Sequence, residues 1–248
     1  MKLPTVATVI PARYSAQRLP GKPLADIHGK PMIQHVYERA ARARGVSLTG
    51  VATDDPRIAE AVERFGGRVW MTSPDLQSGT DRVAAVARLH PEIDIFVNVQ
   101  GDEPFVNRLA LEALINCFKD KDKNVQVASL MKKIKDPALL KDPNCVKVVV
   151  DKNMNSLLFS RSTIPFHRDQ SIQPDYFEHI GVYAFRKSAL MLFTKWPVTP
   201  LEAAEKIECL RYLENGIPLQ MVVTEEASAK IDVPDDLIKA EAFLSKYH

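Results

Sequence analysis

The segment 9–24 limits what this chain can fold into more than any other, because it joins an apolar run to a short, strongly basic loop. The run that it continues, residues 6–10, is apolar and mostly β-branched, which predicts a buried strand. Three cations follow closely, Arg13, Arg18 and Lys22. Pro11, Pro20, Gly21 and Pro23, within and beside this group, deny the loop regular structure.

Beyond this loop, Pro31 opens an amphipathic helix, so the order is strand, basic loop, helix. In α/β proteins this arrangement holds phosphates at the carboxyl end of the first strand, and three cations suit a triphosphate. The alternative is a basic loop that meets only water, which the stiffening prolines disfavour. Neither a Walker loop nor a G-x-G-x-x-G fingerprint is present, so side chains and loop amides must hold the phosphates.

Charge and hydropathy exclude several classes of protein. The formal net charge of +2 over 248 residues argues against a general nucleic-acid surface. No apolar run reaches the roughly 18 residues that a membrane span needs, and no signal-peptide core precedes the first strand, so no membrane insertion is expected. The three cysteines lack Cys-x-x-Cys spacing, which disfavours structural zinc and a disulfide frame and favours a cytoplasmic location.

The first half of the chain alternates strand and helix four times. This alternation predicts an α/β fold: a mostly parallel, Rossmann-like sheet with helices on both faces and ligands beyond the carboxyl ends of the strands. The predicted strands are residues 6–10, 46–52, 68–71 and 93–99, and the helices begin near Pro31, Pro56, Ser78 and Asn107.

The second half departs from this alternation. Its strands follow one another with little helix between them, which predicts an inserted, antiparallel lobe at about 125–186. No Gly- or Ser-rich linker divides the chain, so residues 1–248 are expected to form a single domain. A capping box at 199–202 predicts a helix to about Glu214, followed by a strand at 218–223. The predicted strands of the lobe are residues 125–131, 145–150, 157–160 and 177–186.

Several runs, in order along nearly the whole chain, resemble the bacterial 3-deoxy-manno-octulosonate (Kdo) cytidylyltransferases, the CMP-Kdo synthetases. The resemblance implies a nucleotide-diphospho-sugar transferase-like fold and an enzyme that joins CTP to Kdo, giving CMP-Kdo and pyrophosphate for lipopolysaccharide synthesis. It also implies Mg²⁺ and a homodimer with contacts in the inserted lobe. The runs that carry it are residues 11–24, 100–104, 159–165, 177–186, 208–211 and 231–237.

Two carboxylates are the candidate metal ligands. Asp102 lies on a turn after a strongly apolar strand, and its alternative reading is a turn aspartate that accepts backbone amides. Asp232 lies before the last helix, where an aspartate is usually a cap, but Asp235 is better placed for that. The resemblance implies that both carboxylates bind Mg²⁺, and Mg²⁺ needs only one or two protein carboxylates. It also implies that Lys22 acts in catalysis together with them.

The resemblance also assigns the nucleotide end of the site. Arg13 and Lys22 are expected to contact the phosphates, and Ser78 and Arg82 to lie near the cytosine. The charge of the basic loop adds Arg18 to the expected phosphate contacts. The alternative for Arg82 is an ordinary helix-surface residue.

The sugar contacts implied by the resemblance are five polar side chains. An Arg can grip a carboxylate with two hydrogen bonds, although a lone arginine is often a surface residue. A lone His beside a strand is often a packing residue. The five candidates are Gln100, Arg161, His179, Tyr183 and Glu208.

Cys209 stands where the family usually has a Gln that resembles a sugar contact. The exact sugar acid is therefore open, with 8-amino-Kdo and sialic acid as alternatives to Kdo. We interpret Cys209 as a helix-packing residue rather than a nucleophile. A different class of function is a non-catalytic module that binds CTP without releasing pyrophosphate.

Overall fold

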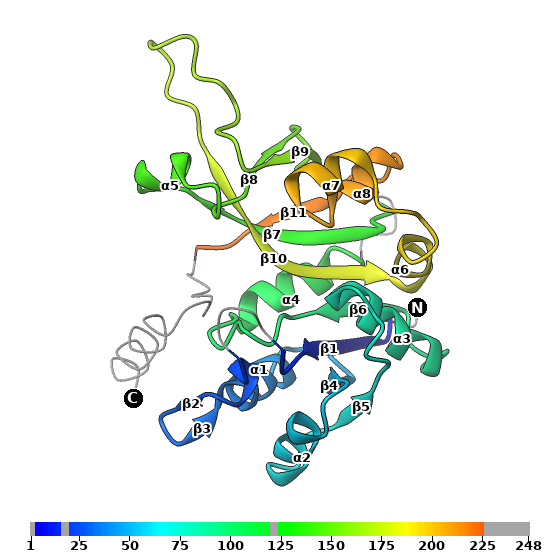
Figure 1. Cartoon of the computed structure of the whole chain (residues 1–248). Helices are drawn as coiled ribbons and strands as arrows, with labels where there is room; N and C mark the ends of the chain where they lie inside the picture. Colours follow the sequence, from blue (N-terminus) through cyan, green and yellow to red (C-terminus); the bar gives the residue numbers. More distant parts are fainter. Residues whose placement is uncertain (1–2, 16–19, 120–123, 226–248) are drawn as a thin grey trace.

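A mixed sheet forms the centre of the protein in this computed structural model, which describes residues 3–15, 20–119 and 124–225 (Figure 1). The strands are β1 (Val6–Ala12), β2 (Asp26–Ile27), β3 (Lys30–Pro31), β4 (Leu48–Thr53), β5 (Val69–Met71), β6 (Ile95–Asn98), β7 (Val127–Lys133), β8 (Lys147–Val150), β9 (Ser156–Ser160), β10 (Phe177–Arg186) and β11 (Gln220–Val223). Within the described residues the main sheet has nine strands in the order β11-β7-β10-β6-β1-β4-β5, and β8 and β9 branch from β10. β2 and β3 form a separate small ladder.

The half of the sheet built from β1, β4, β5 and β6 is parallel throughout. β1 lies between β4 and β6, and its central residue Val9 pairs with Gly50 on one side and Asn98 on the other. The predicted alternation of strand and helix is therefore confirmed. The helices that connect these strands, and the one after β6, are α1 (Met32–Ala41), α2 (Pro56–Arg64), α3 (Gly79–Leu89) and α4 (Arg108–Asn116).

Helices cover both faces of the sheet because the side chains of β1 alternate between two cores. Val6 and Ile10 pack with the inner faces of α1, α2 and α4. Ala7 and Val9 pack on the other face, with α3 and with helices from the second half of the chain. A strand buried on both faces must be apolar at nearly every position, as residues 6–10 are.

Local sequence signals set the starts of these helices. Asp55 accepts a hydrogen bond from the backbone N–H of Arg57 and caps α2, with Pro56 as the first helical residue. Asn107 caps α4, and a capping box of Ser78 and Asp81 begins α3. Each of these three starts lies within one residue of the sequence prediction.

The second half adds antiparallel strands to the same sheet. β10 pairs antiparallel with both β6 and β7, and its bounds are those predicted for residues 177–186. The segment between β9 and β10 projects away from the sheet (Figure 1). Two short helices here were not predicted, α5 (Ala138–Lys141) and α6 (Lys187–Phe193). No helix among the described residues has the length and apolar character needed to cross a bilayer.

The helix predicted from the capping box at 199–202 to Glu214 is not continuous. It is divided into α7 (Pro200–Glu205) and α8 (Leu210–Glu214), with Lys206 in a left-handed conformation at φ 55°. The break lets Arg211 donate to Glu202, with 2.7 Å between Nε and Oε2. In a straight helix, the Cα atoms of residues nine positions apart are separated by about 13 Å along the axis and lie on opposite faces, so the break brings the members of this buried ion pair together.

Gly50 provides a test of packing in the parallel half of the sheet. A Cβ at Gly50 would lie 2.4 Å from Cζ3 of the buried Trp70 ring. We expect Gly50→Ala to lower the free energy of unfolding by about 1–3 kcal/mol, because the indole must be displaced in a packed core. Gly181→Ala is the matched strand control, since a Cβ there meets nothing within 4 Å. Equal urea midpoints for the two variants would contradict this account.

Candidate active site

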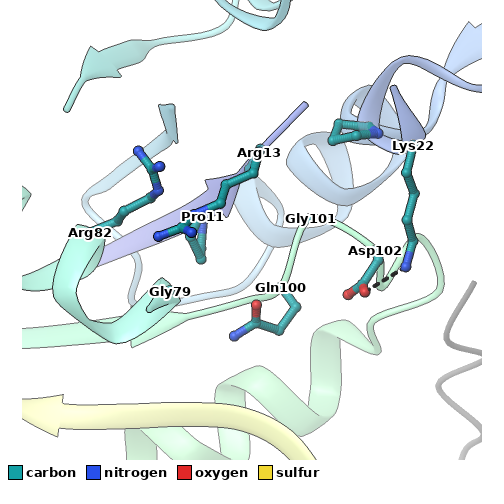
Figure 2. A pocket seen from close by; sticks show the side chains of 10 residues that line it. Pro11, Arg13, Lys22, Gly79, Arg82, Gln100, Gly101 and Asp102 are labelled. Carbon is teal, nitrogen blue, oxygen red and sulfur yellow. Dashed lines mark hydrogen bonds and ion pairs between the residues drawn. The ribbon is translucent and has the colours of Figure 1, made fainter. Parts of the chain in front are cut away.

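A cavity lies at the carboxyl ends of β1 and β6, the edge where the sequence predicted ligand binding (Figure 2). The loop after β1, the first turn of α3 and the turn after β6 converge there. We call this cavity the basic cavity. Its lining residues are Pro11, Ala12, Arg13, Lys22, Pro23, Gly79, Arg82, Gln100, Gly101 and Asp102.

Three cations and a single carboxylate face the basic cavity among the described residues that line it. Lys22 and Asp102 point toward one another, with 2.8 Å between Nζ and Oδ2 (Figure 2). Arg13 donates to the backbone carbonyl of Leu76. The excess of positive charge suits a ligand with several negative charges, as a triphosphate has. The structure thus brings Arg13 and Lys22, both predicted phosphate contacts, to one cavity.

A tight turn places Lys22. Gly21 has φ +70°, and its N–H donates to the carbonyl of Tyr14 at 2.9 Å, which closes the loop just before the 3-10 turn Lys22–Leu24. Glycine adopts a positive φ without the steric cost that a Cβ brings. This turn is followed directly by Lys22, whose side chain pairs with Asp102. Arg18, the third predicted phosphate contact, lies outside the described residues.

Arg82 is wholly buried, which rules out the alternative that it is a helix-surface residue. Its Nη2 lies 2.8 Å from Oδ1 of Asp54, and its Nη1 donates to the hydroxyl of Thr72. Burial lowers the pKa of the guanidinium, and Asp54 opposes that shift. Because a buried cation requires such partners, Arg82 links α3 to the loops after β4 and β5 while it lines the basic cavity.

Two glycines that the sequence analysis did not single out bring backbone close to the cavity. A Cβ at Gly79 would lie 3.2 Å from the Pro11 ring, and one at Gly101 would lie 3.0 Å from the Pro11 carbonyl oxygen. Gly79 is the first residue of α3, so the positive end of that helix faces the basic cavity. Ser78 does not line the cavity; its hydroxyl is engaged with Asp81 in the capping box. Its predicted contact with the nucleotide stays a prediction.

Among the described residues, the side-chain oxygen atoms at the wall of the basic cavity are of the kind that Mg²⁺ binds. Asp102 offers a carboxylate and Gln100 an amide oxygen at the cavity wall. Mg²⁺ needs few protein ligands, because water and phosphate oxygens complete its shell. No cluster of three or more His, Cys, Asp or Glu residues able to hold a metal occurs in the described ranges. Asp232 lies outside them, so its convergence with Asp102 stays a prediction.

A chain of polar and aromatic contacts leads from the basic cavity into β10. Gln100 donates to Oδ1 of the buried Asn98 at 3.3 Å. Asn98 pairs across the sheet with Tyr183, and the Tyr183 ring lies 5.4 Å from the ring of His179, centroid to centroid. Three of the predicted sugar contacts, Gln100, His179 and Tyr183, thus lie along one path.

Glu208, the fourth predicted sugar contact, meets α3 at its first turn. The Thr80 hydroxyl donates to Oε2 of Glu208 at 2.8 Å, although the two residues are 128 positions apart. Burial raises the pKa of the Glu208 carboxyl, Thr80 lowers it, Asp81 and Glu202 raise it further, and Arg211 opposes them. Sequence reasoning missed Thr80, because nothing local links it to Glu208.

Arg161 is occupied by the backbone around α7. Its Nε donates to the carbonyl of Glu205 and its Nη1 to the carbonyl of Pro143, both at 2.6 Å. It is not among the residues that line the basic cavity. Here it anchors the end of α7 to β9. That Arg161 binds the carboxylate of a sugar stays a prediction.

The Cys209 thiol is buried and contacts the Tyr183 hydroxyl. Burial raises the pKa of this thiol, so it stays protonated at neutral pH. Burial likewise raises the pKa of Cys145, to about 11. A buried, protonated thiol is a poor nucleophile, so the environment of Cys209 agrees with its interpretation as a packing residue.

Comparison with known proteins identifies the family. Residues 7–226 match the family model described as cytidylyltransferase. The chain belongs to this family. This cytidylyltransferase is thus a nucleotidyltransferase, and the predicted family and fold class are confirmed.

Three individual proteins show how close the relationship is. The 8-amino-3,8-dideoxy-manno-octulosonate cytidylyltransferase of Shewanella woodyi is 46% identical over 97% of this chain and 98% of its own length. The 3-deoxy-manno-octulosonate cytidylyltransferase 2 of Hydrogenovibrio crunogenus is 48% identical over 96% and 98%. A solved structure of a CMP:2-keto-3-deoxy-manno-octonic acid synthetase complexed with CTP has a TM-score of 0.94 at 42% identity, covering 98% of this chain and 100% of that one.

The Thr80–Glu208 hydrogen bond yields a pH-dependent prediction. Thr80→Val should raise the pKa of Glu208 further. A carboxyl whose pKa is raised by folding stabilises the protein below its unfolded pKa and loses that contribution as the pH rises through the folded value. The variant should therefore lose about 1–3 kcal/mol of unfolding free energy near pH 7 and less near pH 5. Urea unfolding at both pH values measures this, with Thr80→Ser as control; a loss independent of pH would contradict it.

Proposed function

We propose that this cytidylyltransferase joins CTP to 3-deoxy-manno-octulosonate, giving the CMP-sugar and pyrophosphate. The observation that carries the proposal is the basic cavity, which Arg13, Lys22, Arg82 and Asp102 line at the carboxyl ends of the parallel strands. The relative whose solved structure is complexed with CTP supports the nucleotide, and the names of the relatives support a sugar acid of this type.

The reaction is an in-line displacement. The anomeric hydroxyl oxygen of the sugar bonds to the α-phosphorus of CTP, the bond from that phosphorus to the bridging oxygen breaks, pyrophosphate leaves, and the hydroxyl proton passes to solvent. Arg13 and Lys22 offset the charge of the phosphates, and the first turn of α3 offers backbone N–H groups beside Gly79. Arg18 is proposed to join them. No covalent intermediate with the protein is required.

Asp102 and Asp232 are the residues proposed to hold Mg²⁺. A bound divalent cation polarises the phosphoryl group and lowers the pKa of an attacking hydroxyl. Lys22 contributes by pairing with Asp102 at 2.8 Å, which fixes the orientation of the carboxylate at the wall of the basic cavity.

The sugar is proposed to lie between the basic cavity and β10. Gln100 reaches both, because it lines the cavity and bonds to Asn98 beside Tyr183. Glu208 and His179 would contact hydroxyl groups from the far side. Arg161 would have to leave its backbone partners to reach the sugar carboxylate.

A second candidate substrate is the 8-amino sugar acid. The Shewanella woodyi relative carries that name, and the half-buried Glu208 carboxyl could pair with an ammonium group. Sialic acid is the third sugar to test.

The homodimer and the cytoplasmic location also remain proposals. Apolar side chains are strongly exposed on β9 and on the projecting segment before β10, and the proposed dimer would bury them. These are Leu157, Phe166 and Ile172.

Pyrophosphate release tests the proposed function. The full chain with CTP and Mg²⁺ should release pyrophosphate with 3-deoxy-manno-octulosonate and slowly or not at all with sialic acid. Comparison with the 8-amino sugar acid decides between the two candidate substrates, and replacement of CTP by UTP tests the base. Tight CTP binding without pyrophosphate release from any sugar acid would support a non-catalytic module and contradict the proposal.

Asp102→Asn tests the carboxylate at the cavity wall. We expect turnover to fall about a hundredfold or more, because the charge that opposes Lys22 and binds the cation is lost. The magnesium concentration for half-maximal rate should rise. The matched control is Asp175→Asn, which removes a carboxylate that pairs with Lys133 on an exposed surface. Full turnover of Asp102→Asn in magnesium would refute its role.

A further inference from the structure

A buried serine meets the ring of His179 at the irregular part of β10. Ser129 of β7 is fully buried, and the pairing of β7 with β10 shifts register between Ile180 and Tyr183. There the Ser129 Oγ lies 2.9 Å from Nε2 of His179. It also lies 2.9 Å from the carbonyl oxygen of Val182 and 3.2 Å from that of Ile180. One hydroxyl therefore serves three neighbours.

Proton counting assigns the tautomer of the ring. A serine hydroxyl has one proton to donate and lone pairs to accept with, whereas a carbonyl oxygen can only accept. The Ser129 proton therefore goes to the carbonyls of Val182 and Ile180. The third partner must donate to Oγ, so Nε2 of His179 carries a proton. The opposite arrangement would leave both carbonyl oxygens facing a lone pair in a buried site, which is unfavourable.

The other ring nitrogen, Nδ1, is then an acceptor. Burial lowers the pKa of His179 to about 3, so the ring is neutral across the physiological range. The rings of Phe159 and Tyr183 flank it, at centroid distances of 4.7 and 5.4 Å. No charged side chain contributes to this shift. The aromatic neighbours hold the plane of the ring, and Ser129 determines which nitrogen is protonated.

We propose that Ser129 is a positioning residue that holds His179 as the Nε2–H tautomer, so that Nδ1 accepts a hydrogen bond from a donor group of the sugar. The group that meets His179 is then a hydroxyl, or an ammonium in an amino sugar, and not the sugar carboxylate. This rests on the proposed function for the ligand but not for the tautomer. It predicts that the carboxylate is bound elsewhere, by cationic side chains.

Nitrogen-15 NMR of the histidine rings in the full chain tests the tautomer without any substrate. The signal of His179 is identified by its loss in His179→Gln. The wild-type protein should show Nε2 protonated and Nδ1 unprotonated. Ser129→Thr keeps the hydroxyl and should retain this pattern, whereas Ser129→Val, which has the size of Thr but no hydroxyl, should show a mixture of tautomers. Ser129→Ala, which adds no volume, should behave like Ser129→Val. A protonated Nδ1 in the wild-type protein, or an unchanged pattern in both Val and Ala variants, would overturn the proposal.

Kinetics then separate positioning from a purely structural role. In Ser129→Val and Ser129→Ala the KM for the sugar acid should rise about tenfold, the value of one hydrogen bond, while kcat and the KM for CTP stay within about twofold. Ser129→Thr should be near wild type. Equal changes in the KM values of both substrates, or none in that of the sugar, would overturn the proposal. If no sugar acid releases pyrophosphate, the proposed function fails, and the NMR result still decides the tautomer.

Sugar acids lacking one hydroxyl at a time identify the donor. One of these analogues should bind the wild-type protein about tenfold more weakly than the parent sugar does. The same analogue and the parent sugar should bind Ser129→Val with nearly equal affinity. That non-additivity marks the group that meets Nδ1. Strictly additive losses for every analogue would contradict a contact between His179 and a hydroxyl.

Discussion

The parallel pairing of β1 with β6 is the constraint on which the active site depends. Because Val9 pairs with Asn98, the loop after β1 and the turn after β6 leave the sheet at one edge. Lys22 and Asp102, which are 80 positions apart, meet there at 2.8 Å. A slip of one residue would move every side chain of the slipped strand to the other face of the sheet and would separate the pair. The chemistry of the cavity is thus a consequence of strand register.

The first turn of α3 connects this edge to the rest of the molecule. Three of its residues make separate contacts: Gly79 lines the basic cavity, Thr80 donates to Glu208, and Arg82 pairs with Asp54. A helix held by so many directional contacts cannot shift at one of them without straining the others. The nucleotide side and the sugar side of the proposed site therefore share one rigid element, which favours a fixed distance between the two substrates.

In the second half of the chain, irregular points of the backbone place polar side chains. Ser129 satisfies two carbonyl oxygens where β10 is irregular and, by doing so, leaves a histidine ring as an acceptor. The break after α7 turns Glu202 toward Arg211 and lets Glu208 reach α3. Each of these irregularities interrupts a regular element, and each places a polar side chain next to the path between the basic cavity and β10.

The sequence by itself determined the parallel half of the sheet, the caps at Asp55 and Asn107, the bounds of β10 and the cluster of Arg13 and Lys22, since periodicity and capping are local. It also carried the family resemblance. Only the tertiary structure decided that Arg82 is buried and that Thr80 donates a hydrogen bond to Glu208. It also decided that Arg161 donates to backbone carbonyl groups and that the helix predicted to reach Glu214 breaks. Each of these depends on partners far away in the chain, whose approach no local pattern encodes.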